Sequence, residues 1–145
     1  MTRLLPVLLL DDDPDEHYLF KADLEDCGFD FEFAAFTRAA DALSYLSENV
    51  HQPVLVLTDL GLGGEDALEF IASAVGALKG GAVGIYSGVH SPELDQKCKA
   101  AGASFYLVKP ISAEKLEDVI STISGIAVHA VEDGRRRLVA VSHAV

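Results

Sequence analysis

Short apolar segments alternate with longer amphipathic segments along most of the chain. The apolar runs lie at residues 4–10, 31–36, 54–58, 82–86 and 104–108. Runs of this length are typical of buried strands, and the amphipathic stretches between them are typical of crossover helices. The alternation predicts an α/β domain with five strand–helix units. Because such crossovers are right-handed, the helices are expected on both faces of a parallel sheet.

Residues with special backbone preferences predict where the helices begin and end. Asp13 and Pro14 are expected to be the cap and the first residue of the first helix, and Gly28 is expected to end it. Later helices are expected to begin after Thr37, Ser91 and Ser112. The first helix is expected to direct a stripe of side chains inward, namely Tyr18, Leu19, Ala22 and Leu24.

The last stretch of the chain has a different pattern. Two apolar segments, 128–131 and 138–141, flank Asp133-Gly134, a residue pair that favours a tight hairpin turn. We therefore separate a domain of residues 1–125 from a C-terminal extension of residues 126–145. The extension is expected to form a hairpin that covers a sheet edge or pairs with another subunit. A disordered end is the alternative.

Composition narrows the classes of partner. The 145 residues suit one domain, and half of them are apolar. A formal net charge of −12 argues against binding to nucleic acid or to anionic membranes, which require clustered Lys and Arg. Cys27 and Cys98 lack the spacing of a metal site, and we interpret them as small apolar residues in a reducing compartment. With neither a signal peptide nor a membrane span in the sequence, a cytoplasmic location is expected.

Polar side chains follow four of the apolar runs. Asp11 and Asp12 follow the first, Asp59 the third, Ser87 the fourth and Lys109 the fifth. Doubly wound sheets bind ligands at the carboxyl ends of their strands, so we expect these side chains at one edge. Three close carboxylates need a cation, and oxygen ligands suit Mg²⁺. With a lysine and a hydroxyl beside them, they predict a carboxylate nucleophile that forms an acyl phosphate.

The same segments resemble the receiver domain of response regulators in bacterial two-component signalling. The matching pieces are Val7–Pro14, Val54–Leu62, Gly84–Gly88 and Gly102–Pro110, in the order and with the spacing of the family. The resemblance covers about residues 4–124. It implies a CheY-like, flavodoxin-like (βα)5 fold with strand order 2-1-3-4-5. It makes residues 1–125 a receiver domain followed by the extension.

The resemblance also implies roles for the polar residues at the predicted edge. Asp59 is similar to the aspartate that accepts the phosphoryl group. Lys109 would contact a phosphoryl oxygen. A Mg²⁺ (or Mn²⁺) ion would be held by Asp11, Asp12, Asp59 and the backbone carbonyl of Gly61.

A second set of residues is implied to respond to phosphorylation. Ser87 resembles the switch hydroxyl and Tyr106 the switch aromatic, which would turn inward when Ser87 moves toward the phosphoryl group. The peptide bond before Pro110 is typically cis in the family. The chain departs from the family pattern at Gly63, where a proline is usual, and at Ala67, where a glycine is usual. We expect the loop that follows Asp59 to be more flexible for this reason.

The implied function is that of a stand-alone response regulator rather than of an enzyme. A sensor histidine kinase or a histidine phosphotransfer protein would donate the phosphoryl group, and the chain would catalyse only its own phosphotransfer and autodephosphorylation. No segment after the receiver is long enough for a helix-turn-helix domain. The output is therefore expected to be another protein, reached through phosphorylation-dependent docking or by the chain acting as a phosphorelay intermediate. A homodimer is a further partner to be expected.

Two other functions remain open at this stage. A haloacid-dehalogenase-like phosphatase would use Asp11 as nucleophile with Asp13 two residues on. That family needs an acidic pair after the lysine, however, and here Ile111 follows Lys109-Pro110. That assignment also leaves Asp59 without a role. An interaction module without phosphotransfer is favoured by the altered loop and opposed by the complete acid–Ser–Lys set.

Overall fold

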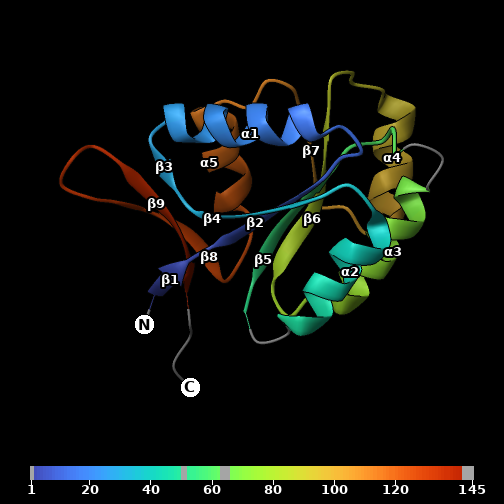
Figure 1. The fold of residues 1–145 in the computed structure, drawn as a ribbon, viewed down its shortest axis with the longest axis horizontal. Coiled ribbons are helices and arrows are strands. Elements are labelled where there is room, and N and C mark those ends of the chain that lie inside the picture. The colour runs from blue at the N-terminus through green and yellow to red at the C-terminus, as the bar shows by residue number, and fades with distance from the viewer. Residues whose placement is uncertain (1, 50–51, 63–65, 142–145) are drawn as a thin grey trace.

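The main sheet of the protein has five parallel strands. The computed structural model describes residues 2–49, 52–62 and 66–141 (Figure 1). Neighbouring strands follow the order β4-β2-β5-β6-β7, with bounds β4 (Glu32–Phe36), β2 (Pro6–Leu10), β5 (Val54–Thr58), β6 (Gly81–Ser87) and β7 (Phe105–Val108). All four pairings are parallel. This confirms the doubly wound five-stranded sheet and the predicted order 2-1-3-4-5.

Helices cover both faces of this sheet (Figure 1). One face carries α1 (Pro14–Asp26) and α5 (Ala113–Ser121). The other carries α2 (Ala39–Glu48), α3 (Ala67–Ala77) and α4 (Pro92–Ala101). Successive side chains of a strand point to opposite faces, so each strand contributes to two cores. In β2, Val7 and Leu9 pack on the side of α1, whereas Leu8 and Leu10 pack on the side of α2 and α3.

Most of the predicted helix caps are present, and one is wrong. The side chains of Asp13, Ser91 and Ser112 each accept a hydrogen bond from a backbone N–H in the first turn of their helix. The C-cap of α1 is Cys27, and the predicted residue Gly28, with φ of 88°, follows it. Helix α2 is instead capped at Arg38, one residue after Thr37, without a side-chain hydrogen bond.

The predicted inner stripe of α1 is right for Leu24 and wrong for Tyr18 and Leu19. Phe20 and Leu24 are buried, whereas Tyr18 is 76% and Leu19 52% exposed. Phe20 makes an edge contact with the ring of Tyr86, at 5.0 Å between centroids. Because residues four apart share a helix face, burying this phenylalanine also buries Leu24 and turns Tyr18 and Leu19 to the surface.

The C-terminal extension forms the predicted hairpin and builds a second sheet. Strand β9 (Arg136–Val141) pairs antiparallel with β8 (Ile126–Ala130). On its other side β9 pairs antiparallel with β1 (Thr2–Leu4) and parallel with β3 (Phe29–Asp30). The hairpin therefore joins the segments that precede β2 and β4 of the same chain (Figure 1).

Side chains of the hairpin enter the core shared by α1 and α5. Leu138 is fully buried in the same cluster as Leu5 and Phe29. The guanidinium of Arg136 lies over the ring of Phe29, 4.6 Å from its centroid, and pairs with Glu117 of α5. The extension is thus packed into the core between the main sheet and helices α1 and α5, and is not merely attached to the surface of the domain.

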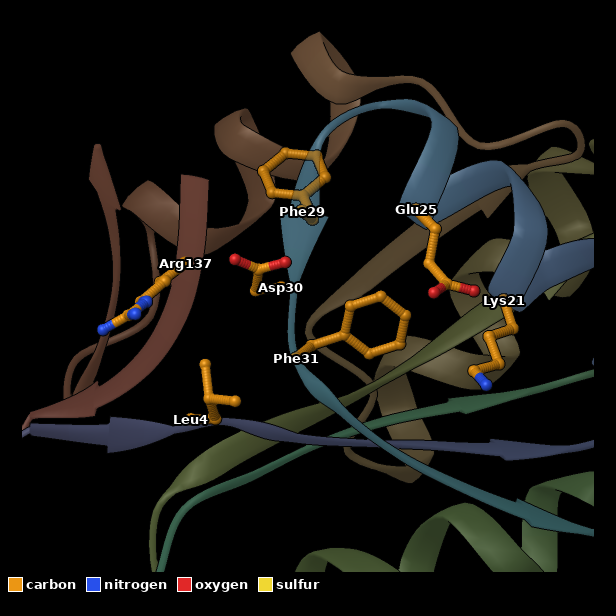
Figure 2. Close-up of a pocket in the computed structure, with 7 residues that line it drawn as sticks. All are labelled: Leu4, Lys21, Glu25, Phe29, Asp30, Phe31 and Arg137. Atoms are coloured by element: carbon orange, nitrogen blue, oxygen red, sulfur yellow. The ribbon is translucent and has the colours of Figure 1, made fainter. Parts of the chain in front are cut away.

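A pocket of about 440 Å³ lies where this second sheet meets α1 (Figure 2). Figure 2 shows Lys21 and Glu25 of α1 on one side and Arg137 of β9 on the other. Its remaining lining, which includes Leu4 and Phe31, belongs to the segments around the amino ends of β2 and β4. The polar residues predicted to act on phosphate follow the carboxyl ends of the strands, so this pocket is not their site.

No helix in the described ranges combines the length and the apolar character needed to cross a bilayer.

Candidate functional site

Backbone hydrogen bonds beyond the strand ends hold the site residues side by side. The N–H of Asp59 donates to the carbonyl of Leu10, at 3.0 Å. The N–H of Lys109 donates to the carbonyl of Ser87, at 2.8 Å. These bonds extend the parallel pairing by one residue past β5 and β7, and they bring the first polar residues after neighbouring strands to one edge of the sheet.

Three carboxylates form the centre of this edge. One oxygen from each of Asp11, Asp12 and Asp59 lies within 4.8 Å of the other two. Asp11 is only 2% exposed and accepts a hydrogen bond from the N–H of Asp13 at 3.0 Å. Burial raises the pKa of Asp11, and the charge of Asp59 adds to the rise, against the lowering effects of the Asp13 N–H and of Lys109. An oxygen-only set of this kind fits a hard divalent cation, which would relieve the repulsion.

The ammonium group of Lys109 lies beside the three carboxylates. Its Nζ is 3.3 Å from Asp11 Oδ2, 3.9 Å from Asp59 Oδ1 and 3.1 Å from Glu16 Oε2. It also lies 5.4 Å from the centre of the Tyr86 ring. Burial by itself lowers the pKa of Lys109, but the hydrogen bond with Glu16 and the neighbouring negative charges outweigh it, so the pKa is raised. The lysine is therefore a fixed positive charge at this edge.

Glu16 is the site residue that the sequence analysis missed. It lies in the first turn of α1, four residues after Asp12. This spacing is the signal that could have found it, because a residue one helical turn beyond a strand end can reach back over that end.

The two predicted switch residues contact the same neighbour. Buried Ser87 accepts a hydrogen bond at its Oγ from the N–H of Val89, at 3.4 Å. The Tyr106 hydroxyl donates to the Val89 carbonyl at 2.6 Å, and the Tyr106 ring meets the His90 ring edge-on. Ser87 and Tyr106 are thus linked through the backbone of one residue.

The loop after Asp59 is described only in part. The N–H of Gly61 donates to Asp59 Oδ2 at 3.2 Å, which orients the carboxylate. Gly63, where the chain departs from the family, lies outside the described residues. Pro110 follows a cis peptide bond, as the resemblance implied. Asp13 serves as the cap of α1 and is not part of the acidic cluster, which disfavours the phosphatase arrangement.

The comparisons with known proteins show which family the chain belongs to. Residues 7–121 match the family model of the response regulator receiver domain, so the chain belongs to that family. Its members are phospho-acceptor modules of two-component signalling. They interact with histidine kinases and downstream targets, and they bind a divalent metal at an acidic pocket. The predicted family is confirmed.

Solved structures show the same fold. The chemotaxis protein CheY4 of Vibrio cholerae matches with a TM-score of 0.67 at 23% identity, over 83% of this chain and 99% of that one. A CheY-like receiver domain protein of Methanospirillum hungatei matches with a TM-score of 0.67 at 25% identity, over 83% and 93%.

A third structure is of a response regulator from Burkholderia pseudomallei, with a phosphorylated aspartic acid, a calcium ion and citrate. It matches with a TM-score of 0.65 at 21% identity, over 77% of this chain. The match spans 64% of the Burkholderia protein. A search among curated proteins found no significant match.

Proposed function

We propose that the chain is a stand-alone response regulator that accepts a phosphoryl group on Asp59 from a histidine kinase or a histidine phosphotransfer protein. The observation that supports this is the position of Asp59, which lies in one cluster with Asp11 and Asp12 and 3.9 Å from the ammonium of Lys109. In the reaction, a carboxylate oxygen of Asp59 bonds to phosphorus while the bond from phosphorus to the donor breaks.

The chain's own residues supply most of the charge that this transfer needs. Asp11, Asp12, Asp59 and the carbonyl of Gly61 would hold Mg²⁺ or Mn²⁺. The bound cation would neutralise part of the charge on the phosphoryl oxygens. Lys109 donates a hydrogen bond to one of these oxygens and the Ser87 hydroxyl to another.

Phosphorylation would be signalled through Val89. When the Ser87 hydroxyl turns to a phosphoryl oxygen, its bond from the Val89 N–H is lost. The backbone of Val89 is then free to shift, the hydrogen bond from the Tyr106 hydroxyl to the Val89 carbonyl breaks, and the Tyr106 ring turns inward. This proposal rests on the two hydrogen bonds that Val89 makes with Ser87 and Tyr106. It is an example of a local charge change that biases a two-state element.

The output proposed for this switch is docking to a downstream protein, or dimerisation, rather than binding to DNA. Residues 1–125 form the proposed receiver unit, and residues 126–145 form its extension. A cytoplasmic location fits a histidine kinase as donor.

The test of the proposed function is incubation with acetyl phosphate and Mg²⁺, followed by measurement of the intact mass. We expect the mass of one phosphoryl group to be added, and we expect base to remove it, as an acyl phosphate requires. An unchanged mass would favour an interaction module without phosphotransfer.

Magnesium should stabilise the protein through the acidic cluster. A ligand present at about 100 times its dissociation constant adds about 2.7 kcal/mol to the free energy of unfolding. We therefore expect Mg²⁺ to raise the melting temperature of the natural protein by several degrees in a thermal scan. Asp12→Asn should remove most of this rise. Asp118→Asn, an equal change of charge on the exposed surface of α5, should retain it. Equal rises in both variants would contradict the proposed metal site.

A further inference from the structure

The ammonium of Lys109 is engaged by a carboxylate that does not belong to the acidic cluster. Its Nζ lies 3.1 Å from Glu16 and 3.3 Å from Asp11, both within hydrogen-bonding distance. Its distance to Asp59 is 3.9 Å, beyond that limit. Among the described residues the nearest acidic partner of Lys109 is therefore Glu16, and not the residue proposed to carry the phosphoryl group.

Glu16 adds negative charge to an edge that has to accept a doubly charged group. Its side chain is 32% exposed, against 20% for Lys109, so the pair is partly shielded from water. Asp11, Asp12 and Asp59 already gather their oxygens within 4.8 Å. The carboxylate of Glu16 is a fourth one at this edge, and it pairs with the Lys109 ammonium that the phosphoryl group would otherwise contact.

We propose that Glu16 restrains Lys109 in the unphosphorylated protein and competes with the phosphoryl group for its ammonium, and so slows phosphoryl acceptance by Asp59. This inference rests on the proposed function of Asp59. Two physical effects act in the same direction. Lys109 has to leave its closest partner to approach an oxygen bonded to Asp59, and the charge of Glu16 repels the incoming anion.

The size of the effect follows from the exposure of the pair. A partly exposed ion pair is weakened by solvent, so its removal changes a rate by a small factor. We expect Glu16→Gln to accept the phosphoryl group from acetyl phosphate about threefold faster than the natural protein. The measurement is the intact mass of the protein over time, at fixed Mg²⁺ and acetyl phosphate.

Asp15→Asn is the matched control. Asp15 is the preceding residue in the first turn of α1, is exposed, and makes no ion pair with Lys109. Its neutralisation removes the same charge from the same end of the helix, so general electrostatics would affect both variants alike. We expect its rate to stay close to that of the natural protein.

A double variant separates competition for Lys109 from every other effect. In a Lys109→Gln background, where the rate is low, adding Glu16→Gln should accelerate the reaction much less than it does in the natural protein, because only the relief of repulsion remains. A second readout is the affinity for beryllofluoride in the presence of Mg²⁺, measured by calorimetry. Glu16→Gln should bind this phosphoryl mimic about threefold more tightly, in line with its rate.

Several outcomes would overturn the proposal. One is a rate for Glu16→Gln that is unchanged or lower than that of the natural protein. The others are an equal acceleration in Asp15→Asn and an equal acceleration without Lys109. Failure of the proposed function itself looks different, because the natural protein would then gain no mass at all.

Discussion

Asp59→Asn should abolish the formation of the acyl phosphate. The amide that replaces the carboxylate is not a nucleophile, and we do not expect another carboxylate of the cluster to take its place. Asp11 is 2% exposed and occupied by the N–H of Asp13 and by Lys109, so it is poorly placed to meet a donor. We expect no mass gain after incubation with acetyl phosphate and Mg²⁺, under conditions in which the natural protein is modified.

Asp41→Asn gives the matched control for this experiment. Asp41 lies exposed in the first turn of α2, and the same change there should leave the mass gain intact. Retention of a base-labile phosphoryl group in Asp59→Asn would refute the assignment of the acceptor. If Asp11→Asn lost the phosphoryl group while Asp59→Asn retained it, the nucleophile would be Asp11, as in the phosphatase alternative.

Leu138→Ala should cost the protein about 2–5 kcal/mol of unfolding free energy. Leu138 belongs to the C-terminal extension, yet it is fully buried among residues such as Leu5 and Phe29, in the core shared by α1 and α5. Shortening it leaves a cavity that the surrounding strands cannot close completely. Denaturation in urea, followed by circular dichroism, measures the loss.

The same substitution at an exposed leucine is the control. Leu94 of α4 is 39% exposed, and its change to alanine should cost less than about 1 kcal/mol. Equal losses at the two positions would mean that the hairpin contributes little to the stability of the domain. A large difference would show that the extension is part of the folding unit.

The sequence contained enough information to predict the main sheet and the location of its chemistry. Each strand is a short apolar run, and a polar residue such as Asp59 or Lys109 follows directly where the run ends. Apolar runs of this kind are typical of parallel strands, and parallel strands bring their carboxyl ends together. The predicted residues therefore lie together, although their roles remain proposals.

The sequence pattern gave wrong predictions for the inward face of α1 and for the N-cap of α2, where neighbouring residues are alternatives for the same position. Tyr18 and Leu19 are large side chains that can be buried as Phe20 can, so the sequence could not fix which face of α1 turns inward. The contact between the rings of Phe20 and Tyr86 decides it in the structure. For the cap of α2, Thr37 offered a stronger side chain than Arg38, yet the helix begins one residue later.

Periodicity and strand ends alone predicted the parallel sheet and the gathering of Asp11, Asp12, Asp59, Ser87 and Lys109 at one edge. The strand order came from the resemblance to receiver domains. Only the tertiary structure decided that β9 lies between β8 and the pair β1 and β3, and that Lys109 lies nearest to Glu16. Both features join segments that are far apart in the chain. Their energies depend on packing in space, which no local pattern of residues records.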